Sequence, residues 1–245
     1  MGLSGNLWPG EIQEQLLHAR TLKPVSNVVF MGMGEPLENF DGVASAIRCM
    51  CDVQTFGVAP SSITVSTVGI VSNMRRLMEE LPKVKIAVSL HAPTQELREQ
   101  IVPIAKSFKL PAVMGAIDEY FERMAADGKR KFSIMVSYCL LEDVNDSEEH
   151  ARQLCELLAG RPVIVNLIPY NPFEGNVHNY RTPSPERVDA FLRVLEKADV
   201  RVFERRHHGR DIGAACGQLA KLGSEAPIAD IESGPGGCAA KPAKE

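Results

Sequence analysis

Val84-Lys-Ile-Ala-Val-Ser-Leu90 (VKIAVSL) is the stretch that does most to decide the fold. It is a short, mostly apolar run with β-branched residues, and such runs predict buried strands. Amphipathic segments follow it, at about residues 94–104 and 111–127, and their spacing predicts helices. A buried strand followed by helices is the unit from which a parallel sheet covered by helices is built.

The same alternation of strand and helix runs along most of the chain. Further apolar runs predict strands at residues 27–31, 63–67, 132–140, 163–168 and 200–204. The remaining helices are predicted at residues 9–20, 41–52, 70–80, 146–158, 184–197 and 212–221. We therefore predict an α/β fold with a parallel sheet, occupying residues 1–222 as one domain. The pattern ends at about Gly223, so residues 223–245 are expected to form a disordered tail.

Composition excludes several classes of protein. The 245 residues are 44% hydrophobic and 24% charged, as expected for a soluble globular protein. The net charge of −4 means that a nucleic acid would have to meet a local basic patch. The six cysteines have no metal-site spacing, and we expect reduced thiols in a cytoplasmic protein. There is no apolar run of about 20 residues, so no membrane partner is expected.

Polar and small residues gather where the predicted strands end. These positions are Gly32-Met-Gly-Glu-Pro36, Ser66-Thr67, Ser89-Leu-His91 and Pro169-Tyr-Asn-Pro172. In parallel α/β sheets and barrels, ligands bind at the carboxyl ends of the strands. We therefore predict a ligand site at this edge.

Each of these motifs also has a structural interpretation when it is taken alone. GMGEP lacks the third glycine of a dinucleotide fingerprint, so Glu35 is either a ligand for an ammonium group or a solvated carboxylate after a tight turn. Ser66 and Ser89 can bind a ligand or satisfy loose backbone groups. His91 can be a catalyst or a hydrogen-bonded structural residue, and Asn171 can hold a ligand or cap its proline-flanked loop.

Cys216 lies among small residues in Gly209–Gln218, GRDIGAACGQ. It follows Asp211, a predicted N-cap, and a helix N-terminus favours a reactive thiolate. A free cysteine is more commonly a small buried apolar residue. The basic cluster from Arg201 to Arg210 can likewise contact phosphates or form a solvated face.

Five segments together resemble one family. They are GMGEPLENFDGV, ITVSTVGIV, VSLHAPTQELREQIVPI, VNLIPYNPF and GRDIGAACGQLA, in the order found in the radical S-adenosylmethionine (SAM) adenine-C2 RNA methyltransferases of the RlmN type. The related Cfr-type enzymes methylate C8. The resemblance spans about residues 3 to 221 and implies a (β/α)6 radical SAM barrel. It also implies methylation of C2 of adenine in 23S-type ribosomal RNA, with transfer RNA as a further candidate substrate.

The resemblance assigns roles to individual residues. Gly34 and Glu35 match positions that hold the amino group and backbone of SAM, and Asn171 matches the asparagine at its methionine part. Further SAM contacts match Ser66, Ser89, Leu90 and His91. Cys216 matches the catalytic cysteine that one SAM methylates. In the family, a radical from a second SAM removes hydrogen from that S-methyl group, and the carbon radical adds to the adenine.

The sequence also departs from the family. The family holds a [4Fe–4S] cluster with a C-x3-C-x2-C motif on the first barrel strand, and this spacing does not occur among the six cysteines. No metal ligands are therefore predicted here, and the chain is expected to form a partial barrel that lacks the first strand and the N-terminal accessory domain. We expect these 245 residues to be inactive alone.

Two accounts of this departure stay open. The favoured one is a fragment or mis-started reading frame of a methyltransferase that works as a monomer with an external electron donor. A missing N-terminus would leave an organellar location open. The alternative is a degenerate paralogue that binds SAM or RNA without a cluster. An unrelated α/β-barrel metabolic enzyme does not explain five motifs in order.

Overall fold

The sheet contains six parallel strands in a computed structural model that describes residues 5–32, 34–126, 134–172 and 178–205. The strands follow the chain order β1-β2-β3-β4-β5-β6. Their bounds are β1 (Val28–Phe30), β2 (Ile63–Thr67), β3 (Lys85–Ser89), β4 (Met135–Leu140), β5 (Ile164–Pro169) and β6 (Val202–Glu204). Each strand therefore pairs with the strand that precedes it in the sequence.

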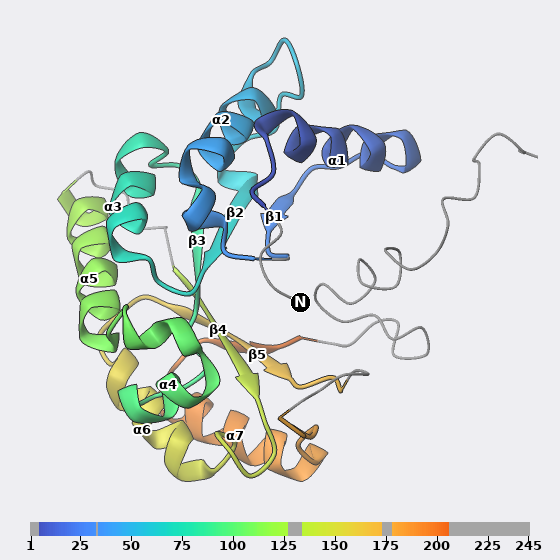
Figure 1. The fold of residues 1–245 in the computed structure, drawn as a ribbon. Helices are drawn as coiled ribbons and strands as arrows, with labels where there is room; N and C mark the ends of the chain where they lie inside the picture. Colours follow the sequence, from blue (N-terminus) through green and yellow to red (C-terminus); the bar gives the residue numbers. More distant parts are fainter. Residues whose placement is uncertain (1–4, 33, 127–133, 173–177, 206–245) are drawn as a thin grey trace, which may run out of the picture.

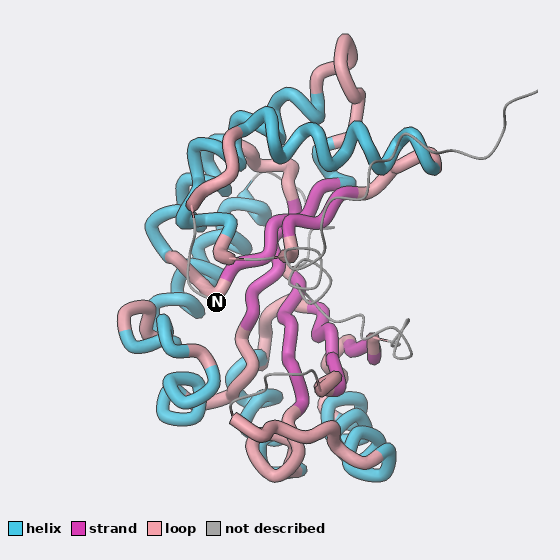
Figure 2. The backbone as a smooth tube through the Cα atoms, turned by 45° about the vertical axis from the view of Figure 1, so that its right-hand side comes forward, coloured by secondary structure: helices cyan, strands magenta, loops and turns pink. Residues whose placement is uncertain are grey.

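Helices form an arc around one side of this sheet (Figure 1). They are α1 (Pro9–Leu22), α2 (Phe40–Cys51), α3 (Val71–Glu80), α4 (Gln95–Ile101), α5 (Leu110–Ala126), α6 (Glu148–Leu158) and α7 (Pro185–Lys197). Short 3-10 helices occur at Pro36–Asn39, Pro60–Ser62 and Pro103–Lys106. The tube view from a second direction shows the strands side by side, with the helices around them (Figure 2).

Side-chain caps fix the start of several helices. The Ser147 side chain accepts a hydrogen bond from the His150 backbone at the start of α6, and Ser184 accepts one from Arg187 at the start of α7. Pro185 occupies the first turn of α7, where a missing N–H costs nothing. These residues set the helix starts at the ends of the connecting loops.

Successive side chains along each strand point to opposite faces of the sheet. Val136 and Tyr138 of β4 join the hydrophobic core, as do their register partners Val165 and Leu167 of β5. Ser137 and Asn166 lie between them in sequence and so point to the opposite face. Tyr138 also donates a hydrogen bond to the Asn145 backbone oxygen at 2.9 Å, so its hydroxyl is satisfied inside the core.

The predicted α/β fold and all six predicted strands are confirmed. Several predicted elements are shorter than expected, including the last strand and one helix. The last strand covers only Val202–Glu204, and the helix predicted at 94–104 ends at Ile101 because Pro103 cannot donate a helical hydrogen bond. In the part of the chain that is described, no helix is long and apolar enough to span a membrane. The helix predicted at 212–221 and the tail at 223–245 lie outside the described residues.

Candidate cofactor-binding site

Glu35 joins the ends of two strands. Its Oε1 accepts a hydrogen bond from the Leu37 backbone at 2.9 Å, and its Oε2 accepts one from Val68 at 2.7 Å. Glu35 is therefore a partly buried carboxylate that caps backbone N–H groups rather than a freely solvated one. Burial raises the pKa of this carboxyl, while the hydrogen bonds from Val68 and Leu37 act in the opposite direction. A carboxylate offers about four acceptor positions, so further positions remain for a cationic ligand.

Gly34 gives the loop after β1 its shape. Its φ is +82°, in the left-handed region that favours glycine, and a Cβ built there would meet nothing within 4 Å. The space beside this backbone is therefore open. A ligand can approach the peptide groups next to Glu35 closely.

Two hydroxyls lie side by side on neighbouring strands. Ser66 Oγ of β2 is 3.4 Å from Ser89 Oγ of β3. Ser66 is buried and Ser89 is partly exposed, so the pair reaches from the sheet toward solvent. Leu90 differs, because its side chain is fully buried in the core. Of the matched segment, Ser89 and His91 are the members whose side chains remain partly exposed.

His91 is held in one orientation by its neighbours. It adopts a φ of +60°, and its Nδ1 accepts a hydrogen bond from the Cys139 backbone at 3.0 Å. The Asn145 side chain donates to the His91 carbonyl at 2.8 Å. Burial and the positive charge of Arg98 lower the pKa of His91 to about 4. The imidazole is therefore neutral at pH 7, with its proton on Nε2 as a hydrogen-bond donor.

Asn171 lies in a loop that is anchored on both sides. The Tyr170 backbone N–H donates to Leu140 at 3.0 Å, and Thr182 Oγ1 donates to the Tyr170 carbonyl at 2.8 Å. The Tyr170 ring also meets Tyr180 edge-on, with ring centroids 6.2 Å apart. Asn171 itself is partly buried at the carboxyl end of β5, as the site prediction requires.

The prediction concerned the ends of β1, β2, β3 and β5, and hydrogen bonds connect the first three of them. Glu35 connects the ends of β1 and β2, the serine pair connects β2 and β3, and His91 connects the end of β3 to β4. Cys216 lies outside the described residues, as does most of the basic cluster. Of that cluster, Arg201 and Arg205 are described, and both are exposed.

Arg98 of α4 was not recognised from the sequence. It is fully buried, and its guanidinium donates to the carbonyls of Leu90 at 3.3 Å and Phe108 at 2.9 Å, and to that of Val68. Burial lowers the pKa of this group. Val68 and Leu90 directly follow β2 and β3. Arg98 therefore fixes the backbone at these two strand ends, where the candidate site lies.

Asn145 is a second positioning residue that the sequence did not reveal. Its side chain is fully buried, and its Nδ2 donates to the carbonyls of His91 at 2.8 Å and Cys139 at 2.7 Å. Its Oδ1 accepts from Leu141 at 2.7 Å. An asparagine between two acidic residues in a loop gives no sequence pattern that points to this bridging role.

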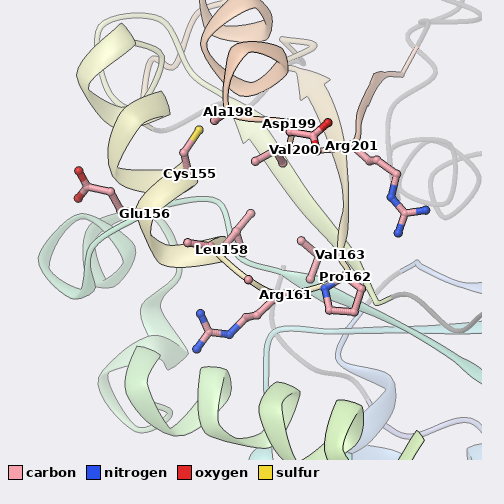
Figure 3. A pocket seen from close by; sticks show the side chains of 12 residues that line it. Cys155, Glu156, Leu158, Arg161, Pro162, Val163, Ala198, Asp199, Val200 and Arg201 are labelled. Carbon is pink, nitrogen blue, oxygen red and sulfur yellow. The ribbon is translucent and has the colours of Figure 1, made fainter. Parts of the chain in front are cut away.

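A cavity lies at the other end of the sheet. It has a volume of about 480 Å³ and lies between the segments that lead into β5 and β6, where Cys155, Arg161, Asp199 and Arg201 contribute to its wall (Figure 3). None of the predicted site residues lines it. The predicted site and this cavity are therefore separate features.

The residues at the carboxyl edge fit SAM but not an iron–sulfur cluster. Gly34 leaves the backbone open, Glu35 offers acceptors for an ammonium group, and the serine pair with His91 offers neutral polar groups. Among the described residues, no three histidine, cysteine, aspartate or glutamate side chains come together as metal ligands. The described cysteines, Cys49, Cys51, Cys139 and Cys155, are free thiols.

Comparison with known proteins shows which proteins the chain resembles. The chain is 45% identical over 222 residues to a probable dual-specificity RNA methyltransferase RlmN of Symbiobacterium thermophilum, covering 89% of this chain and 58% of that protein. It is 41% identical to the corresponding protein of Salinibacter ruber, covering 92% of this chain and 61% of the relative. The chain is a homologue of the RlmN-type methyltransferases. It spans about three fifths of the length of these curated relatives.

Solved structures agree with this assignment. A radical SAM methyltransferase from Sphaerobacter thermophilus matches the fold with a TM-score of 0.81 and 35% identity, covering 89% of this chain and 63% of that chain. A domain of a pyruvate-formate lyase-activating enzyme from Bacteroides vulgatus shares the fold at a TM-score of 0.53 and 19% identity, covering 74% of this chain and all of that domain. No family model matches the chain. The resemblance to the RlmN-type family that was inferred from the five motifs is confirmed.

Proposed function

We propose that this chain forms the SAM- and RNA-binding part of an RNA methyltransferase that acts on C2 of adenine, in ribosomal RNA and in transfer RNA. The observation that carries the proposal is the hydrogen-bonded edge formed by Glu35, the Ser66–Ser89 pair and His91. The dual-specificity RNA methyltransferase names of relatives at 41–45% identity support methylation of RNA, and the position C2 is part of the proposal.

Each residue at the edge then has a defined task. The Glu35 carboxylate accepts from the ammonium group of SAM, beside the open backbone at Gly34. Ser66 and Ser89 bind hydroxyl or amine groups, His91 donates from Nε2, and Asn171 holds the methionine part. When bound, SAM supplies the methyl group. In this proposal Cys216 accepts it and carries it to the adenine.

The proposal assigns RNA binding to local groups rather than to overall charge. The net charge of the chain is −4, so long-range attraction to RNA is weak. Arg205 directly follows β6, is exposed and belongs to the basic cluster that precedes Cys216 in the sequence, whereas Arg201 lies at the amino end of β6 beside the cavity. Arg205 can bind a phosphate of the RNA at the carboxyl edge.

We further propose that the chain does not complete methyl transfer by itself. The six cysteines lack the C-x3-C-x2-C spacing, and the described residues do not offer a cluster-binding set. The same observation favours a second candidate function, binding of SAM or RNA without methyl transfer. The experiments below separate the two.

Calorimetry of the full chain with SAM tests the binding site. We expect weak but saturable binding, because SAM normally also chelates the cluster iron, and about tenfold weaker binding for Glu35→Gln. Glu119→Gln is the matched control, since Glu119 pairs with Arg75 on the helical surface. Absence of saturable SAM binding by the unmodified chain contradicts the proposed site.

Anaerobic reconstitution with iron and sulfide tests the second part. We expect neither stoichiometric [4Fe–4S] uptake nor methylation of an adenine-containing ribosomal RNA hairpin. Stoichiometric uptake accompanied by adenine methylation overturns the proposal that the chain is inactive alone. Binding of the hairpin without methylation is the result expected for the binding function.

A further inference from the structure

The face of the sheet opposite the hydrophobic core carries a polar row. Ser89 of β3 is in register with Ser137 of β4, and Ser137 is in register with Asn166 of β5. Because side chains alternate between faces along a strand, register partners share a face. The Ser66 hydroxyl, 3.4 Å from Ser89 Oγ, begins the row on β2. The row therefore continues the candidate SAM site across two more strands.

Two atoms of this row have unmet hydrogen-bonding capacity. Ser137 and Asn166 are only 1% and 4% exposed, and Ser137 Oγ and Asn166 Oδ1 have no hydrogen-bond partner within the described part of the chain. Each buried polar atom without a hydrogen-bond partner lowers the stability of the folded chain by about 1–3 kcal/mol. A third unbonded atom, Asp146 Oδ2, differs because it lies 2.9 Å from Arg187 Nε in an ion pair. Folded proteins contain few buried atoms of this kind, so two neighbouring ones require an explanation.

The surroundings of the pair favour a flat, neutral ligand. The register pair Met135–Ile164 lies two residues before it on the same face, and Cys139–Ile168 lies two residues after it. All four of these side chains are uncharged and partly exposed. Met135 is unbranched and flexible, so its displacement can open access to the buried pair. This apolar frame around two polar groups suits a heteroaromatic ring better than a phosphate or carboxylate.

An asparagine amide matches one edge of adenine. Its oxygen accepts from the 6-amino group while its nitrogen donates to N7, and a serine hydroxyl can donate or accept beside it. We propose that Ser137 and Asn166 form a subsite that binds the hydrogen-bonding edge of an adenine, supplied either by SAM or by the RNA. This inference rests on the proposed function, because that function brings both adenines to this face of the sheet.

Titration of the full chain with adenosine and inosine tests the subsite directly. Inosine has a carbonyl oxygen where adenosine has the 6-amino group, so it cannot donate to Asn166 Oδ1. We expect the chain to bind adenosine about tenfold more tightly than inosine, and Asn166→Leu or Ser137→Ala to remove or weaken this preference. Thr64→Val is the matched control, because Thr64 lies on the same face two residues before Ser66.

Stability measurements separate ligand recognition from a structural role. Asn166→Leu removes an unpaired buried polar group, so its urea midpoint should equal or exceed that of the unmodified chain. A lowered midpoint contradicts the inference, as does equal binding of adenosine and inosine by the unmodified chain. An adenosine preference that survives Asn166→Leu contradicts it as well.

Two further ligands identify which adenine is bound. If Asn166→Leu weakens binding of SAM, the cofactor supplies the adenine; if it weakens binding of a ten-nucleotide oligo(A) RNA relative to oligo(U), the RNA supplies it. If the unmodified chain binds SAM or oligo(A) and Asn166→Leu weakens the binding of neither, the inference is contradicted. If the unmodified chain binds neither SAM nor oligo(A) but still prefers adenosine to inosine, the proposed function fails while the adenine subsite stands.

Discussion

Two arginines stabilise opposite ends of the same sheet in different ways. Arg98, at the carboxyl edge, is fully buried and donates to the backbone carbonyls of Val68, Leu90 and Phe108. Arg161, at the amino edge, forms two hydrogen bonds of 2.7 and 2.8 Å to the Asp118 carboxylate, with a side chain that is 25% exposed. Burial lowers the pKa of Arg98, whereas Asp118 raises that of Arg161.

The difference shows that the backbone is held more firmly at the carboxyl edge of the sheet than at the amino edge. Arg161 neutralises the Asp118 carboxylate and donates to one backbone carbonyl, that of Leu157, at 2.7 Å. A guanidinium shared by three carbonyls fixes the position of three chain segments at once. The amino edge has the cavity of about 480 Å³, but the carboxyl edge has the fixed backbone on which a ligand site depends.

Replacing each arginine with methionine gives the largest expected effect. Arg98→Met leaves the carbonyls of Val68, Leu90 and Phe108 without this donor and should lower the free energy of unfolding by about 3 kcal/mol. Arg161→Met should cost about 1 kcal/mol, because its partner Asp118 is partly exposed and can be hydrated. Urea denaturation of both variants measures the difference. Equal losses would show that the two edges are held equally firmly.

Acidification should destabilise the carboxyl edge through His91. Its pKa is about 4 in the folded chain against 6.5 as the ordinary value, so the unfolded chain binds the proton more readily between these values. Stability should therefore fall by about 2 kcal/mol as the pH drops from 6.5 to 4.5.

His91→Asn isolates this effect, because asparagine tolerates the positive φ and does not titrate. Denaturation midpoints measured across the pH range should show a shallower loss for this variant. His18→Gln, which removes an exposed imidazole from α1, is the control. A pH profile that His91→Asn leaves unaltered contradicts the role of His91.

The smallest effect is expected at the amino edge. Asp118→Asn breaks the Arg161 ion pair and should lower the free energy of unfolding by about 0.5 kcal/mol at low salt, with less effect in 1 M NaCl. SAM binding should be unchanged, since none of the predicted cofactor residues lies at this edge. Calorimetry and denaturation at two salt concentrations check both expectations, and weakened SAM binding would show that the edges are coupled.

The strands were predictable because burial on both faces produces apolar runs. Ile63–Thr67 was predicted with its observed bounds, and all five of its residues are buried. The predicted strand at 200–204 was too long, since the apolar pattern does not show where pairing to β5 begins. The break after Ile101 depends on Pro103, which was visible in the sequence but lay within an otherwise continuous helical pattern.

The site was only partly predictable. Strand ends and family motifs pointed to Glu35, Ser66, Ser89 and His91; the structure pairs the two serines and bonds Glu35 and His91 to the backbone of neighbouring strand ends. Arg98 was missed because a charged residue in an amphipathic helix normally marks the solvent face. Ser137 and Asn166 were missed because polar residues alternating with apolar ones in a strand look like solvent-facing positions, although both are buried. Only the three-dimensional packing distinguishes these cases.

The strand order β1-β2-β3-β4-β5-β6 has a consequence for how the chain reaches this structure. During synthesis, every strand after β1 emerges when its hydrogen-bonding neighbour has already been made. The sheet can therefore grow in one direction on the ribosome, without waiting for a distant segment to close it. Such growth keeps the loops that must close short and shortens the time for which an unpaired strand edge is exposed to aggregation.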